Sequence, residues 1–149
     1  MPTGSDARQR RWRLAAEDGS ASVEFLALSV ILLVPLVYLM VFAAQIQAAA
    51  FGAVAAADQA ARVVVSADGG RPGPAEGAIR LTLGDYGVAA DAYDASLACD
   101  IGGCGSLEPG EVVEVRVAVE LTPPLVPGSW LPQGLVTVDS SARARMPRY

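Results

Sequence analysis

One glutamate stands at the leading edge of the most apolar stretch in this chain. Glu24 is the single charged residue between Asp18 and Asp58. It lies five residues after Gly19. Cleavage of the Gly19–Ser20 bond would create a new α-amino group beside a bilayer. That cation could pair with the Glu24 carboxylate of a neighbouring subunit, which would offset the cost of placing the charge there only when subunits assemble. The alternative is that Glu24 lies among lipid headgroups or favours the N-terminus of a helix.

A long helix is expected to follow this glutamate. The apolar run 23–42 covers 20 residues, or about 30 Å of helix, which matches the hydrocarbon core of a bilayer. Pro35 lies inside the run and is expected to kink the helix. The alanine-rich sequence that follows contains nothing to stop a helix before the turn-rich stretch 68–74. We therefore expect one helix from Ser20 to about Ser66, with its second half outside the membrane.

The alanine-rich half of this helix has two interpretations. It is either a plain stalk or a surface that packs against sibling helices, because small residues allow helices to approach closely. Asp58 and Arg62 lie four residues apart within it. They are expected to pair on the helix surface.

The distribution of charge indicates the orientation of the chain in the membrane. The apolar run is preceded by four arginines, which are Arg8, Arg10, Arg11 and Arg13. Arginines next to a membrane helix stay on the cytoplasmic side, so the N-terminus is expected inside and the C-terminal part outside.

Composition argues against several classes of function. The net charge of −5 argues against nucleic acid as a partner, because phosphate binding needs clustered positive charge. The chain contains no histidine, so a Ser-His-Asp or Cys-His arrangement is impossible. The aspartates at positions 85, 91, 94 and 100 fit no calcium-loop spacing. We expect no enzymatic activity, no cofactor and no metal.

The C-terminal part is expected to form a small antiparallel sheet with one short helix. The helix can open at Pro74, with Ile79, Leu83 and Tyr86 on its apolar face. Strict alternation of valines with polar residues predicts a strand over 111–121, and similar alternation predicts another over 135–146. A short strand is expected over 96–99, and turns are expected around Gly102–Gly105 and Glu108–Glu111. Arg143 and Arg145 could face Glu114 or Glu120 across the last two strands.

The two cysteines are best interpreted as a structural disulfide. Cys99 and Cys104 would close a loop of six residues, which stabilises the folded chain by about 2 kcal/mol on the chain-entropy model. A metal site would need two further ligands, and a redox motif would need two intervening residues instead of four. The expected location outside the cytoplasm allows the disulfide to persist.

The residues around Glu24 resemble a known class of signal. Gly19, Ser20, Glu24 and Phe25 are similar to the class III signal peptide of type IV pilin-like proteins. In those proteins, a membrane peptidase cuts after the glycine, and the glutamate five positions later serves assembly. The wider sequence Asp18-Gly19-Ser20-Ala21-Ser22-Val23-Glu24-Phe25-Leu26-Ala27-Leu28 resembles the opening of TadE-like proteins. The Ala60-Ala61-Arg62 element and the layout of the C-terminal part are also similar to that family.

The resemblance implies a minor pilin or pseudopilin of a tight-adherence (Flp-type) pilus or a related secretion system. It implies a prepilin peptidase, other pilin-like subunits and an assembly platform as partners, in addition to the membrane. The part after the helix is much longer than in a major Flp pilin, so the main filament subunit is not expected.

The expected organisation has four parts in an α+β chain with one transmembrane helix. Residues 1–19 form a basic cytoplasmic leader, 20–44 the transmembrane helix, 45–67 a helical extension and 68–149 the outer α+β domain. Two alternatives remain open at the level of sequence. One is an uncleaved single-pass membrane protein whose outer domain binds a ligand or an envelope partner. The other is a secreted domain released near Ala48-Ala49-Ala50, although the apolar run is long for a signal peptide.

Overall fold

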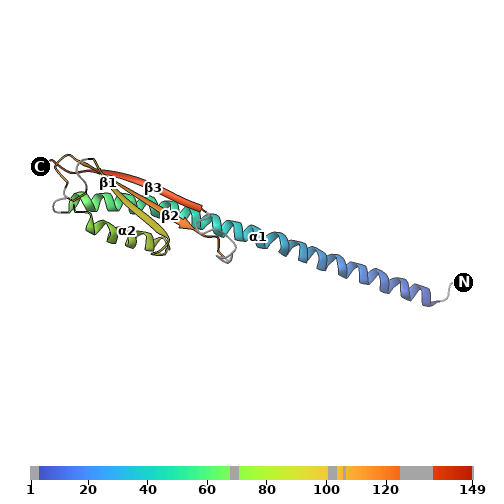
Figure 1. The fold of residues 1–149 in the computed structure, drawn as a ribbon. Helices are drawn as coiled ribbons and strands as arrows, with labels where there is room; N and C mark the ends of the chain where they lie inside the picture. The colour runs from blue at the N-terminus through green and yellow to red at the C-terminus, as the bar shows by residue number, and fades with distance from the viewer. Residues whose placement is uncertain (1–3, 68–70, 101–103, 106, 125–135, 149) are drawn as a thin grey trace. The chain divides into compact units, whose positions relative to one another are not determined.

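The computed structural model describes the backbone of residues 4–67, 71–100, 104–105, 107–124 and 136–148, and side chains from residue 21 onward. The chain has an α+β fold of two helices and three strands (Figure 1), as the sequence predicts. Its elements are α1 (Gly4–Ser66), α2 (Gly73–Asp85), β1 (Tyr93–Cys99), β2 (Val112–Leu121) and β3 (Val136–Arg145). The chain divides into two compact units, Met1–Val41 and Phe42–Tyr149. We call the second one the outer unit.

Helix α1 ends where the sequence predicts but begins much earlier. Its last residue is Ser66, and it continues on both sides of Pro35. Its first residue is Gly4, so the prediction of a start near Ser20 was wrong. The leader lacks apolar periodicity, yet its arginine, alanine, glutamine and glutamate residues are all good helix formers. Propensity alone therefore allows the leader to be helical, and Ser20 is an interior residue of α1 rather than its first residue.

The three strands form one antiparallel sheet in the order β1–β2–β3. The alternation predicted for the central strand is confirmed, because its valines at 113, 115, 117 and 119 are fully buried. β3 shows the same alternation of half-buried and exposed residues along its whole length. β1 begins at Tyr93, three residues before the predicted start. Aspartate and alanine have low strand propensity, and pairing with β2 overrides it.

The core of the outer unit is built on an alanine face of α1. The buried alanines are Ala49, Ala53, Ala56, Ala57, Ala60 and Ala61. They belong to one cluster with the inward valines of β2 and with Ile79 and Leu83 of α2. Because alanine has a small side chain, a helix with this face can lie close against a sheet. The chain's own sheet and second helix cover this face, so it is neither a plain stalk nor a surface left open for sibling helices.

Two close contacts hold the end of α2 and the turn before β2 in place. A Cβ on Gly52 of α1 would lie 3.1 Å from the Tyr86 ring, so glycine permits the end of α2 to approach. The predicted turn at Glu108–Glu111 is confirmed: the Glu111 N–H donates to the Glu108 carbonyl at 3.0 Å. Its third residue, Gly110, has a φ of 98°, a conformation that glycine adopts without strain.

Several sequence predictions fall outside the described residues. They concern part of the turn-rich stretch (68–70), part of the glycine loop (101–103) and the first residue of the strand predicted over 135–146. The predicted pair of Asp58 and Arg62 is confirmed, with 3.0 Å between the Arg62 Nε and the Asp58 carboxylate.

Enlarging a buried alanine of α1 tests the packing of this helix on the sheet. We expect Ala57→Leu to lower the free energy of unfolding of the outer unit by about 1–3 kcal/mol, because overpacking forces neighbouring side chains and backbone apart. The measurement is urea unfolding of the full chain in nonionic detergent, followed by pulse proteolysis. Gln59→Leu is the matched control, because Gln59 is exposed on the same helix. Equal effects of the two substitutions would contradict the packing described here.

Candidate membrane and assembly segment

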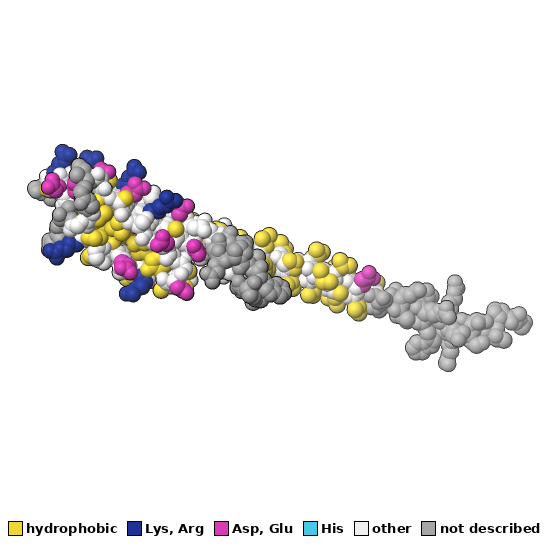
Figure 2. Space-filling model, in the orientation of Figure 1, with side chains coloured by type: hydrophobic (Ala, Val, Ile, Leu, Met, Phe, Trp, Pro, Cys, Tyr) yellow, Lys and Arg dark blue, Asp and Glu magenta, His cyan; other side chains and the backbone are white. Residues whose placement is uncertain are grey.

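The apolar part of α1 has no cover within the described structure. Its large side chains are mostly exposed, with Phe25 at 72% and Ile31 at 69%. Figure 2 shows hydrophobic side chains over the visible face of this segment. Helix residues Ala21–Ser66 form the one described helix that is long and apolar enough to cross a membrane. Burial of each such side chain contributes about 1.5–3 kcal/mol, so a lipid or protein cover would stabilise this segment strongly.

Glu24 lies at the N-terminal edge of this exposed apolar surface. Its side chain is exposed, and its neighbours Val23 and Phe25 are 67% and 72% exposed. Within the described residues, no cationic side chain forms an ion pair with it. A carboxylate in this position is costly in lipid, by up to about 3 kcal/mol at the bilayer centre and less near its surface. The arrangement thus leaves room for a cation supplied from elsewhere.

The predicted processing bond lies inside the helix. The backbone of Gly19 and Ser20 is helical, while their side chains lie outside the described residues. The segment Asp18-Gly19-Ser20 combines three residues of lower helix propensity than the alanines around it, and glycine alone costs about 1 kcal/mol relative to alanine. This bond therefore lies at a weak point of the helix.

The disulfide predicted from the sequence is present in the structure. Cys99 is the last residue of β1 and Cys104 lies in the turn that follows, with their Cα atoms 5.6 Å apart. Cys99 is partly buried against the core, because it faces inward opposite Val113. The bridge thus fixes the end of an edge strand to the loop that leads to buried Leu107.

Among the described residues, the outward face of the sheet carries two ion pairs. An Arg143 nitrogen lies 2.8 Å from the Glu114 carboxylate, as one of the sequence alternatives proposed. A second pair joins Arg116 to Asp139 at 2.7 Å, and the sequence did not reveal it because the strand register was unknown. Arg145 lies opposite Val112 instead of a glutamate. Exposed pairs of this kind contribute about 0–1 kcal/mol each.

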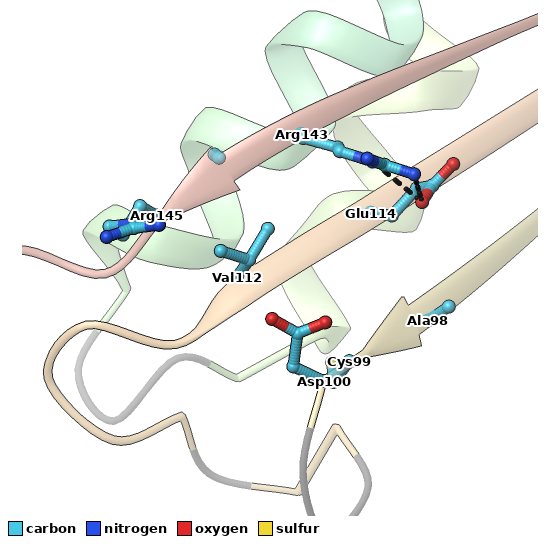
Figure 3. Close-up of a pocket in the computed structure, with 8 residues that line it drawn as sticks. Ala98, Cys99, Asp100, Val112, Glu114, Arg143 and Arg145 are labelled. Atoms are coloured by element: carbon cyan, nitrogen blue, oxygen red, sulfur yellow. Dashed lines mark hydrogen bonds and ion pairs between the residues drawn. The ribbon is translucent and has the colours of Figure 1, made fainter.

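A shallow hollow lies on this face at the end of the sheet (Figure 3). It has a volume of about 510 Å³ and is lined by Asp100, Val112, Glu114, Arg143 and Arg145, among others. Glu114 and Arg143 are already paired with each other. Within the described residues, no three His, Cys, Asp or Glu side chains are grouped to hold a metal ion.

Comparison with known proteins leaves the architecture as the main basis for inferring function. No protein-family model, curated protein or solved structure matches the chain. The long N-terminal apolar helix followed by a small antiparallel sheet is a pilin-like architecture. We therefore infer function from the apolar helix, with Glu24 at its edge, and from the disulfide.

Reduction of the disulfide tests its role as a staple. We expect dithiothreitol to lower the free energy of unfolding of the outer unit by about 2 kcal/mol, because a six-residue loop is no longer closed in the unfolded chain. The urea midpoint of the full chain in detergent, with and without reductant, measures this effect. The matched control is the double variant Cys99→Ser/Cys104→Ser, whose midpoint should not respond to reductant. An unchanged midpoint of the native chain would contradict the assignment.

Proposed function

We propose that the chain is a TadE-like minor pilin or pseudopilin, a structural assembly component of a bacterial tight-adherence pilus or related secretion system. The observation that carries the proposal is the position of Glu24. It is the one acidic side chain at the head of an exposed apolar helix, five residues after a glycine. The pilin-like architecture supports the same proposal. The proposed role is structural and not catalytic.

Processing at the Gly19–Ser20 bond gives the glutamate a partner. The new α-amino group would lie at the start of a helix, where the macrodipole disfavours a positive charge and favours a nearby carboxylate. In one chain, Ser20 and Glu24 are four residues apart, or about 6 Å along the helix axis. A neighbouring chain displaced by one turn could supply its own glutamate to the same amino group. Assembly would then replace an isolated carboxylate with an ion pair in a medium of low dielectric constant.

The proposed location is the cytoplasmic membrane, with the leader in the cytoplasm and the outer unit outside. The arginines at positions 8, 10, 11 and 13 support this orientation through the positive-inside rule. The Cys99–Cys104 disulfide supports it independently, because disulfides persist mainly in oxidising compartments. The proposed partners are the membrane, a prepilin peptidase, other pilin-like subunits and an assembly platform.

The mature N-terminus tests the proposal directly. We expect the chain extracted from the membranes of its own cells to begin at Ser20 when analysed by mass spectrometry. Gly19→Leu should abolish this processing, because a peptidase specific for glycine loses its recognition residue. Gly4→Leu is the matched control and should still be processed. A chain that begins at Met1 would contradict the proposal, and one that begins near Phe51 would indicate a secreted domain.

The Glu24→Gln variant separates assembly from processing. Glutamine keeps the size of the side chain but cannot pair with an α-amino cation. We therefore expect normal cleavage and a loss of at least tenfold in cross-linked multimers recovered from membranes, since each factor of ten corresponds to about 1.4 kcal/mol of lost interaction. Ser29→Ala is the control: it removes a polar group from the same helix and should leave the yield of multimers unchanged. Normal multimer yield in Glu24→Gln would show that the carboxylate has no role in assembly.

A further inference from the structure

Both outer strands of the sheet present backbone groups that β2 does not use. The Glu120 N–H donates to the Ala92 carbonyl at 2.8 Å, and the Asp100 N–H donates to the Val112 carbonyl at 3.3 Å. Hydrogen-bonded residues alternate along an antiparallel pair. The backbone groups of Tyr93, Ala95 and Leu97 on β1 therefore point away from β2, and no hydrogen bond within the described residues satisfies them.

The same alternation defines the free edge of β3. The Met146 N–H donates to the Glu111 carbonyl at 2.9 Å, which places Ala144 and Ala142 in hydrogen-bonded pairs with β2. The backbone groups of the intervening residues point to the open side. These residues are Thr137, Asp139, Ser141, Arg143 and Arg145. An edge strand of ten residues with free donors and acceptors is a template for pairing with another strand.

Helix α2 leaves the edge of β1 open. A hollow of about 520 Å³ lies between the two elements, lined by Gly73, Glu76 and Ile79 of α2 and by Tyr93, Ala95 and Leu97 of β1. Asp94 also lines the hollow, but the other three residues on the β1 side are those whose backbone groups point outward. A strand beside β1 would therefore meet both free hydrogen-bonding groups and partly apolar side chains, as in other cases of strand addition.

The two edges are compatible in direction. β1 and β3 both run antiparallel to β2, so they run parallel to each other. A second copy displaced sideways without inversion would place its β3 beside β1 in a parallel pair. Such a contact uses different surfaces on the two copies, so it can repeat from copy to copy.

Charge supports this pairing at one end of the sheet. Asp100 and Arg145 both lie opposite Val112, so they are at the same level of the sheet, and both line the hollow in Figure 3. Side by side in neighbouring copies, they would carry opposite charges. A symmetric β3–β3 pair that keeps both outward faces on the same side would have to be antiparallel, which would invert one copy relative to the other. At the other end, Asp94 would meet Asp139, but Asp139 is already paired with Arg116 at 2.7 Å.

We propose that β1 of one copy pairs with β3 of a second copy of this chain, so that neighbouring outer units share one continuous sheet. This inference rests on the proposed function, because it names a contact by which subunits assemble. The predicted partner is the chain itself, with Asp100 of one copy near Arg145 of the next.

Photo-cross-linking in membranes tests this contact. A benzoylphenylalanine residue replaces Ser96 of β1 in the full chain, and a second preparation carries it in place of Ser141 of β3. We expect the first to cross-link to β3 and the second to β1, with isotope-labelled copies showing that the two peptides come from different molecules. The control carries the probe in place of Gln59, which is an exposed residue of α1 and not of an edge strand, and should cross-link to neither strand.

Charge variants then test the pairing of Asp100 with Arg145. Arg145→Asp and Asp100→Arg, each alone, should lower the yield of the β1–β3 cross-link about two- to fivefold, the range expected for an exposed pair. A mixture of the two variants should recover the yield, because each then supplies the charge that the other lacks. Failure of the mixture to recover it would contradict this pairing.

The outcomes separate this contact from the proposed function. Cross-links confined to other proteins, or to β1 with β1, would overturn the contact. A chain processed to Ser20 without a β1–β3 cross-link would leave the proposed function standing and overturn the inference alone. A β1–β3 cross-link between chains that retain Met1 would support the contact and contradict the proposed function.

Discussion

The two halves of helix α1 need different environments, and the rest of this structure depends on that requirement. From Ala21 to Val41 its large apolar side chains are exposed within the described chain, and a bilayer is the environment that suits them. From Ala49 to Val64 the same helix presents a face of mostly alanine to a sheet and a second helix. The two halves of this continuous helix therefore have sequences that match two different environments.

The outer unit shows how a small core can be built on such a helix. Alanines bury little area each, so the larger contributions come from the inward valines of β2 and from Ile79 and Leu83. The disulfide at the end of β1 adds a constraint where the sheet has an edge strand. The outward face of the same sheet carries exposed ion pairs, and the described residues contain no group of three His, Cys, Asp or Glu side chains that could hold a metal ion. This division fits a unit that is held together on one face and is available for contacts on the other face and the edges.

The sequence predicts those features that depend on local periodicity or on spacing along the chain. The alternating valines of β2, the Asp58–Arg62 pair and the end of α1 at Ser66 are of this kind. The pairing of Arg116 with Asp139 could not be predicted, because it depends on a register set by residues distant in sequence. The start of α1 was misjudged because the arginine-rich leader has helix propensity without an apolar pattern. Among the candidate site residues, the cysteine pair is confirmed by the structure. The roles of Gly19, Ser20, Glu24 and Phe25 depend on partners that one chain cannot show.

The account depends most on the claim that the two halves of α1 lie in different media. Nitroxide labels at Ile31→Cys and Phe51→Cys, in the full chain in lipid vesicles with the native disulfide left oxidised, measure this directly. Both side chains are well exposed in the structure, at 69% and 68%, so a difference between them reports the medium and not the fold. The account predicts that the label at position 31 collides mainly with oxygen, which partitions into lipid, and that the label at position 51 collides mainly with a water-soluble nickel chelate. Equal access of the nickel chelate to both labels would contradict the membrane-spanning assignment and the proposals built on it.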